Sequence, residues 1–427
     1  MAMRKRRKIS EILKIILSLL LSLAIFILAY FMKYNGVTYV ITFALGVTIF
    51  KLILSIIYKP VYQRKKTVKK TVTAIMPNFN EKLPNVKRGF ETLLNQDYKI
   101  DQFIFVDDGS DSDEVYNYVK ELSKQDNRIQ AFRMNENRGK KEAQIFAFKY
   151  VKSDYILLFD TDSLLDKDSL GNLMAAFDKR DTGAVVGTIK VSNENSNFIV
   201  NMQKLLYTSA FRFSRSAQSL TGCVSVCSGA FSVFKFRIIK KNISKFSGKI
   251  VGMKMSAGDD RLLTSIVLEA GYKTRYQSNA ICYTEVPDNV TKFLKQQIRW
   301  AKSGYILALY SIKMIFKNPF IPFWQWTEAY IWIFNTVLAI YIGVNSFVAY
   351  ITGIGNIDIT QIIVYDQVSI ALLYFLGNYG ISNFYIAKED IKLFLVGFIH
   401  KLFYALLLIY IRIKAILTIK KSTWGTR

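Results

Sequence analysis

The stretch Tyr155-Ile-Leu-Leu-Phe-Asp160-Thr-Asp162 decides how this chain of 427 residues is organised. Its five mostly apolar residues predict a strand buried on both faces, which is typical of a parallel sheet in an α/β domain. Two carboxylates follow at the C-terminal end of the strand, where α/β sheets bind their ligands. Asp160 and Asp162 would suit Mg²⁺ or Mn²⁺ carrying a substrate diphosphate. Two solvated acids in a loop would have the same sequence, so the motif needs support from other segments.

Strand and helix patterns alternate on both sides of this stretch and predict a Rossmann-like α/β sheet. The expected strands are 71–76, 103–106, 129–133 and 184–191. Strand ends would bring Asn80, Asp107 and Asp108 to one edge, where an acid followed by glycine can hydrogen-bond a ribose or a base. Lys140, at the start of a helix, can meet a phosphate, although a solvated helix face explains it equally well. The glycine-rich dinucleotide and P-loop signatures are absent, which argues against an oxidoreductase or a P-loop ATPase.

The charge balance and the rare residue types narrow the class of protein. Lys plus Arg number 58 against 32 acids, a net charge of +26, which favours acidic lipid, nucleotide substrates or a polyanionic product as partners. Zinc-finger spacing and RNA-binding signatures are absent, so no nucleic-acid partner is expected. The single histidine, His400, excludes a multi-histidine metal site, and the three cysteines form no disulfide framework. Catalysis must therefore rest on carboxylates.

Long apolar blocks at both ends predict a multi-pass protein of the plasma membrane. Blocks 12–32 and 37–58 would form a two-span hairpin over residues 1–58, with basic flanks on the cytoplasmic side. A signal peptide is the alternative for the first block, but no small-residue cleavage site follows it. The remaining expected units are a cytosolic α/β domain at 59–300, an amphipathic interfacial helix at 301–320, a membrane region at 321–418 and a cytosolic tail at 419–427.

The membrane region contains three apolar blocks, at about 323–350, 362–381 and 393–417. The loop 352–366 lacks Lys and Arg and is placed outside, whereas the basic tail is placed inside. If the first two blocks cross the bilayer, the third must be re-entrant, interfacial or a tight hairpin.

Three further segments would complete a catalytic site. Gly258-Asp259-Asp260-Arg261 precedes a helical run, where the helix dipole alone could favour its two acids. Small residues around Cys227 and Ser228 let the backbone approach a ligand closely. Lys295-Gln296-Gln297-Ile298-Arg299-Trp300 ends the α/β domain. Transfer of a sugar from a nucleoside diphosphate needs a metal for the leaving group, a base for the acceptor proton and a platform for the acceptor ring. Asp260 suits the base and Trp300 the platform, although Trp300 could also be a membrane-interface anchor.

Together these motifs resemble those of the processive, inverting, membrane-embedded glycosyltransferases of family 2, the cellulose, chitin and hyaluronan synthases. The likeness is strongest to the short bacterial hyaluronan synthases and covers nearly the whole chain. Its motifs are Val-Asp-Asp-Gly-Ser (106–110), Asp-Thr-Asp (160–162), Ala-Gln-Ser-Leu-Thr-Gly (217–222), Val-Cys-Ser-Gly (226–229), Gly-Asp-Asp-Arg (258–261), Lys-Gln-Gln-Ile-Arg-Trp (295–300) and Trp-Gly-Thr-Arg (424–427). Cellulose synthases carry Thr-Glu-Asp in place of Gly-Asp-Asp, which favours hyaluronan. Chitin-oligosaccharide synthases share the Trp-Gly-Thr-Arg ending.

The resemblance implies a GT-A catalytic domain and a role for each matching residue. The expected roles are catalysis for Asp260, with Asp259 and Arg261; metal binding for Asp162, with Asp160; UDP binding for Asn80, Asp107, Asp108, Lys140, Asp160, Arg299, Trp424 and Arg427; and acceptor binding for Cys227, Ser228, Gln296 and Trp300. It further implies that a single chain polymerises UDP-GlcNAc and UDP-GlcA into hyaluronan, with Mg²⁺ or Mn²⁺, and passes the polymer through its membrane helices. A chitin synthase, a non-processive lipid glycosyltransferase and a non-catalytic membrane channel are the alternatives.

Overall fold

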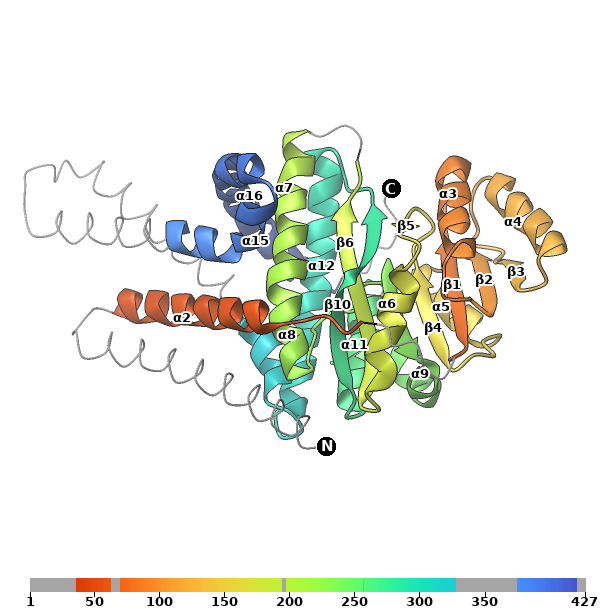
Figure 1. Ribbon diagram of the computed structural model, residues 1–427, viewed down its shortest axis with the longest axis horizontal. Coiled ribbons are helices and arrows are strands. Elements are labelled where there is room, and N and C mark those ends of the chain that lie inside the picture. The colour runs from red at the N-terminus through yellow and green to blue at the C-terminus, as the bar shows by residue number, and fades with distance from the viewer. Residues whose placement is uncertain (1–35, 63–69, 194–196, 256, 328–374, 421–427) are drawn as a thin grey trace, which may run out of the picture.

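A mixed sheet of eight strands lies at the centre of the protein (Figure 1). The computed structural model describes residues 36–62, 70–193, 197–255, 257–327 and 375–420, and the structural statements below concern these residues. The strand order is β3-β2-β1-β4-β7-β6-β10-β5, and β8 and β9 form a separate pair. The bounds are β1 Val72–Asn78, β2 Gln102–Asp107, β3 Ile129–Arg133, β4 Tyr155–Phe159, β5 Leu164–Leu165, β6 Thr182–Val191, β7 Phe231–Lys235, β8 Lys249–Ile250, β9 Met253–Lys254 and β10 Lys273–Thr284.

The strand directions confirm the predicted parallel sheet only in part. β1 to β4 pair in parallel, as expected. β7, however, runs antiparallel between β4 and β6, and β5 runs antiparallel to β10, so the sheet as a whole is mixed. All five residues of β7 are buried, which is the same pattern that a parallel strand shows. The apolar pattern of the sequence therefore could not reveal the direction of this strand.

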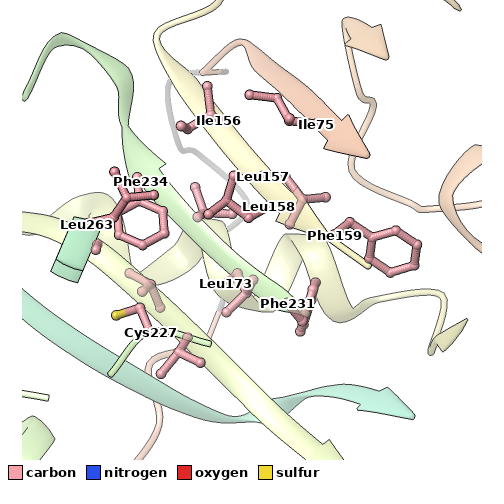
Figure 2. Packing of buried hydrophobic residues seen from close by; sticks show 14 of the residues in the cluster. Ile75, Ile156, Leu157, Leu158, Phe159, Leu173, Cys227, Phe231, Phe234 and Leu263 are labelled. Atoms are coloured by element: carbon pink, nitrogen blue, oxygen red, sulfur yellow. The ribbon is translucent and has the colours of Figure 1, made fainter. Parts of the chain in front are cut away.

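Strand β4 has the bounds that the sequence predicted, and all five of its residues are buried. Figure 2 shows Leu157 and Leu158 among apolar side chains that include Phe234 of β7 and Leu173 of α6. Because β4 is covered by apolar side chains, the two carboxylates that follow it mark the point where the chain leaves the core.

Helices cover the sheet and extend beyond it. α5 packs on β1 and β2, whereas α6 packs on β6 and β10. The bounds are α2 Gly36–Ile57, α3 Leu83–Leu94, α4 Glu114–Gln125, α5 Lys140–Phe148, α6 Ser169–Ala175, α7 Phe198–Thr208, α8 Ser216–Thr221, α9 Phe236–Lys241, α10 Ile243–Ser247, α11 Asp259–Glu269, α12 Val290–Ser311, α15 Phe384–Glu389 and α16 Ile391–Leu417. Ser209–Arg215 joins α7 to α8 with π-helical hydrogen bonding, and Ala176–Asp178 and Ile312–Met314 are 3₁₀ turns.

Helices α7, α12 and α16 pack together beside the sheet (Figure 1). Their shared apolar cluster includes Met202 of α7, Phe293 of α12 and Leu408 of α16. α12 runs without interruption past Trp300, so the predicted boundary between residues 300 and 301 lies within one helix. The reason is local, since neither glycine nor proline follows Trp300 closely enough to end the helix there.

The predicted interfacial segment 301–320 is packed on one side only. Leu307 and Tyr310 are buried in the main core, so much of this segment belongs to the folded domain. Leu309 and Phe316, by contrast, are exposed, Phe316 almost completely at 99%. Some apolar residues of this segment therefore pack into the protein core, and others form an exposed apolar face.

Within the described part of the chain, α16 is the one helix long and apolar enough to cross a membrane. It is continuous, so a tight hairpin at 393–417 is ruled out. The corresponding apolar stretch of α2, Ala44–Ile57, is shorter, and Phe50 of α2 stacks on Trp324 with ring centroids 6.0 Å apart. The predicted span 12–32 and most of the blocks between 328 and 374 lie outside the described residues.

Candidate active site

Parallel strands β1 and β2 bring polar side chains from distant parts of the sequence to one edge of the sheet. Asn78 and Asp107 end these strands in register, and Nδ2 of Asn78 donates to Oδ1 of Asp107 at 2.8 Å. Thr161, between the two carboxylates that follow β4, donates its hydroxyl to Oδ1 of Asn78 at 3.4 Å. Asn78 therefore ties the Asp160–Asp162 loop to the end of β2, a role that the sequence did not reveal.

Asp107 and Asp108 are buried and hydrogen-bonded inside the protein. Asp107 accepts the hydroxyl of Ser110 at 2.6 Å, and Asp108 accepts the backbone N–H groups of Arg138 and Gly139 at 3.0 and 2.7 Å. Burial raises the pKa of Asp108, and these two N–H groups oppose the rise. Both carboxylates thus shape the loops at this edge, and their predicted contact with uridine remains a proposal.

Asn80 lies next to this pair in a left-handed conformation, with φ at 53°. Its side chain and Asp111 hold each other: Nδ2 of Asn80 donates to Oδ2 of Asp111, and the backbone N–H of Asp111 donates to Oδ1 of Asn80, both at 2.9 Å. The structure therefore places Asn80 at the predicted edge and joins it to the loop that follows β2.

Lys140 is the central cation of the candidate site. Its Nζ lies 2.5 Å from Oδ1 of Asp160. Burial alone would lower the pKa of Lys140, but the carboxylates of Asp160, Asp259 and Asp260 outweigh it and raise that pKa. Acids from two segments about a hundred residues apart in sequence therefore act on one ammonium group.

Asp260 is the second residue of α11 and faces the same centre. Its Oδ2 accepts the backbone N–H of Gly229 at 3.2 Å, and a Cβ on Gly229 would lie 3.1 Å from Nζ of Lys140. Burial and the neighbouring charge of Asp259 raise the pKa of Asp260, against the opposing charge of Lys140. Gln144 in turn holds Asp259 through a hydrogen bond of 2.8 Å. The predicted convergence of the Asp160 and Asp260 segments is thus present in the geometry.

Tyr207 of α7 joins this centre to the acceptor segment on α12. Burial raises the pKa of its hydroxyl; the charge of Arg215 opposes the rise, and the charges of Asp162 and Asp160 add to it. The ring of Tyr207 lies 6.4 Å from that of Trp300, which is 40% exposed. Trp300 is therefore partly accessible and lies near a tyrosine that the charges of Asp160 and Asp162 reach; its role as an acceptor platform remains a proposal.

The other predicted acceptor residues lie in different environments. The side chain of Cys227 is fully buried in the core (Figure 2), where burial raises the pKa of the thiol to about 12, so a direct contact of the thiol with an acceptor is not possible in this conformation. Ser228 is more accessible and accepts Nη2 of Arg215 at 3.0 Å. Gln296 accepts Nε2 of Gln297 at 3.5 Å.

Arg261 and Arg299 are half-buried, on α11 and α12. Trp424 and Arg427 lie outside the described residues.

Asp160 and Asp162 are oxygen donors of the kind that a divalent ion takes, and Asp160 is paired with Lys140 in this structure. The carboxylates flank Thr161, and the backbone of this loop lies against α3, where a Cβ on Gly89 would come within 2.6 Å of the Thr161 oxygen. No cluster of three or more His, Cys, Asp and Glu side chains that could hold a metal occurs among the described residues. Mg²⁺ is commonly held by one or two carboxylates together with substrate phosphates and water, so a pair of acids suits it.

Sequence reasoning missed several residues of this centre. Gln144, Tyr207 and Arg215 lie on helices and in a π-helical segment whose local patterns are those of ordinary helices. Gly258 had a clearer signal, because a glycine before two acids at a helix start indicates a special backbone conformation. Its φ is +80°, and a Cβ there would meet the side chain of Ser303 on α12, with Oγ at 2.7 Å.

Gly258→Ala is therefore expected to separate the Asp260 segment from α12. Gly271 is a matched control, because its φ is +83° and nothing lies within 4 Å of the added Cβ. Gly271→Ala should cost about 1–2 kcal/mol of unfolding free energy from backbone strain alone. Gly258→Ala should cost about 1–3 kcal/mol more, from the clash with Ser303, and should also lower kcat/KM. Urea unfolding and steady-state kinetics of both variants check this, and equal effects would contradict it.

Comparisons with known proteins agree with this geometry. Residues 73–243 match the model of the family described as "Glycosyl transferase family 2". Hyaluronan synthase of Streptococcus pyogenes is 29% identical over 83% of both chains, and the N-acetylglucosaminyltransferase of Rhizobium meliloti is 31% identical over 59% of this chain and 60% of its own. A solved mannosyltransferase from Pyrobaculum calidifontis, in complex with GDP-Man and Mn²⁺, shares the fold: the TM-score is 0.55 at 18% identity, over 80% of this chain and 96% of that one.

Proposed function

The chain is a family 2 glycosyltransferase homologous to hyaluronan synthases, and from this premise we propose that it polymerises UDP-GlcNAc and UDP-GlcA into hyaluronan and passes the polymer across the membrane. The observation that carries the proposal is the Lys140 centre, where the charges of Asp160, Asp259 and Asp260 act on one ammonium group. The homology extends beyond the catalytic domain, over 83% of the chain, which supports a membrane protein of the same organisation.

In the proposed reaction Asp260 acts as the base. The acceptor hydroxyl loses its proton to the Asp260 carboxylate while its oxygen bonds to the anomeric carbon of the donor sugar. The bond from that carbon to the UDP oxygen breaks on the opposite side, so a single displacement inverts the configuration. UDP departs with the bonding electrons and its added negative charge. A raised pKa makes Asp260 a stronger base than an ordinary aspartate.

The other residues bind and orient the two substrates. Lys140 places positive charge beside the departing diphosphate. When bound by Asp160 and Asp162, a divalent ion would offset the rest of that charge. Trp300 offers its exposed face to the C–H side of the acceptor ring, and Arg299 with Gln296 would frame it. Asp107, Asp108 and Asn80 would shape the uridine subsite, and the tail carrying Trp424 and Arg427 would close over the diphosphate.

Removal of divalent ions is expected to abolish turnover, because one lysine balances only part of the diphosphate charge and the carboxylates of Asp160 and Asp162 then repel the diphosphate. Activity should return with Mg²⁺ or Mn²⁺ after EDTA treatment. Asp162→Asn should lower kcat/KM by about 10²-fold at a fixed metal concentration. Asp178→Asn is the control. Asp178 is not one of the site residues, and its Oδ1 lies 3.5 Å from Nζ of Lys70. Full activity in EDTA would contradict the metal assignment.

The substrate assay decides between the proposed function and its alternatives. Purified enzyme in lipid nanodiscs is given UDP-GlcNAc alone, UDP-GlcA alone, or both, and the products are separated by size. Long polymer that requires both donors and is degraded by hyaluronidase supports hyaluronan. Polymer from UDP-GlcNAc alone supports chitin, the candidate that the similarity to N-acetylglucosaminyltransferases favours. Single sugar-lipid products would instead indicate a non-processive enzyme.

A further inference from the structure

We propose that a small cavity between α7 and α16 receives the carboxylates of the acidic sugars in the growing polymer, with Lys401 as their positive contact. This inference rests on the proposed function, since only a polymer that contains uronic acid carries such groups.

The cavity lies within the α7, α12 and α16 cluster. Its volume is about 50 Å³. Leu205, Leu206 and Ser209 line it from the α7 side, and His400, Lys401 and Tyr404 line it from α16. Asn383, which precedes α15, also contributes to the wall. The lining thus combines apolar side chains with an ammonium, a hydroxyl and an amide.

Lys401 is the unusual member of this lining. It lies in the middle of α16, the helix with the length and composition of a membrane span, where a cation is costly and marks a functional position. Its Nζ donates to the hydroxyl of Ser382 at 2.9 Å. Among the ion pairs found in the described ranges, none includes Lys401. Its Nζ also lies 5.5 Å from the centroid of the Tyr379 ring. Neither contact neutralises the charge, which an anion in the cavity would therefore meet.

The cavity adjoins the proposed acceptor segment. Tyr404, one turn of α16 beyond Lys401, donates its hydroxyl to Oε1 of Gln297 at 3.3 Å. Gln297 lies within one turn of Trp300 on α12. The α7 segment that supplies Leu206 and Ser209 also carries Tyr207, whose ring is near that of Trp300. The cavity wall is therefore joined by these contacts to the helix that carries Trp300, and the proposal places it beside the path of the growing chain.

The chemistry of the lining selects the occupant. The volume is that of a small polar group rather than a sugar ring, so a side group of the polymer would enter while the rings pass outside. The hydroxyls of Ser209 and Tyr404 and the amide of Asn383 already donate to protein acceptors, so the ammonium of Lys401 is the group that would hold an anion. An ammonium has three N–H donors and gives one to Ser382, and a carboxylate accepts strong charge-assisted hydrogen bonds from the others. An alternating polymer presents a carboxylate on every second sugar, whereas a polymer of GlcNAc alone has none.

The test compares polymer length and early transfer in full-length enzyme in nanodiscs. Lys401→Met removes the charge; Lys401→Gln removes it but retains a donor for Ser382; Lys401→Arg keeps it. Lys414→Met is the matched control, because Lys414 is an exposed lysine on the same helix. Both neutral variants should shorten the product about tenfold, the effect of losing one charge-assisted contact to the retained chain. The rate of UDP release in the first additions should stay within about twofold of wild type, and Lys401→Arg should restore the length.

Each outcome decides the inference. Wild-type length in either neutral variant would overturn it, because a hydrogen bond or packing alone would then suffice. Short product from Lys401→Arg would overturn it as well. If Lys401→Met aggregates, Lys401→Gln decides, since it keeps the polar contact. If wild-type enzyme makes no polymer containing GlcA, the proposed function itself has failed, and that result is visible before any variant is compared.

Discussion

Asp260→Asn is expected to lower the rate of polymer synthesis by about 10³-fold while UDP binding is retained. Asparagine has nearly the shape of aspartate and can still accept the backbone N–H of Gly229, but it cannot take the acceptor proton. The loss should therefore appear in kcat, with little change in the affinity for UDP measured by calorimetry.

The raised pKa of Asp260 gives two further signatures. The carboxylate is the active form, so kcat/KM of the wild type should fall with decreasing pH through a midpoint above about 4, the value of an ordinary aspartate. An acid whose pKa is raised by folding also costs stability once the pH exceeds both pKa values. The asparagine variant should therefore unfold at a temperature no lower than that of the wild type.

Glu121→Gln serves as the control for this variant, because Glu121 is an exposed helical acid far from the centre. It should change neither rate nor stability. If Asp260→Asn kept more than about a tenth of the wild-type rate, Asp260 would not be the base.

Lys140→Met is expected to lower kcat/KM by about 10²- to 10³-fold, because the diphosphate loses the cation that the proposed mechanism places beside it. The substitution also leaves the carboxylates of Asp160, Asp259 and Asp260 without the charge that balances them. Since Lys140 lowers the pKa of Asp260, its removal should raise that pKa further. The acid limb of the pH profile should therefore move to higher pH in the variant than in the wild type.

Lys149→Met, at the end of the same helix, is the matched control, because Lys149 is exposed. A double-mutant cycle of Lys140→Met with Asp160→Asn measures the coupling across the 2.5 Å contact. Two results together would show that Lys140 is not part of the catalytic centre. They are an acid limb of the kcat/KM profile at the same pH in Lys140→Met as in the wild type, and additive effects of the two substitutions on kcat/KM.

The protein sequence was informative wherever the signal is local. The apolar run before Asp160 predicted β4 with its observed bounds, because a buried strand needs a continuous apolar segment. Asp259 and Asp260 were predicted to lie at the N-terminus of a helix, where negative charge is favoured, and α11 begins at Asp259. The resemblance to the glycosyltransferase family was likewise visible in short motifs, because each motif places its polar residues at fixed spacings within a few positions of the chain.

The tertiary structure alone decided which of these residues face one another. The antiparallel direction of β7, the uninterrupted passage of α12 through Trp300 and the burial of the Cys227 thiol do not follow from local pattern. Lys140 was equally compatible with a phosphate or with solvent; only the folded chain gives it Asp160. The physical reason is that periodicity and turn chemistry act over a few residues, whereas the partner of a side chain depends on the packing of whole elements. The sequence by itself therefore determined the strand, the motifs and the reaction class, and the packing of the sheet against α7, α11 and α12 decided the centre they form.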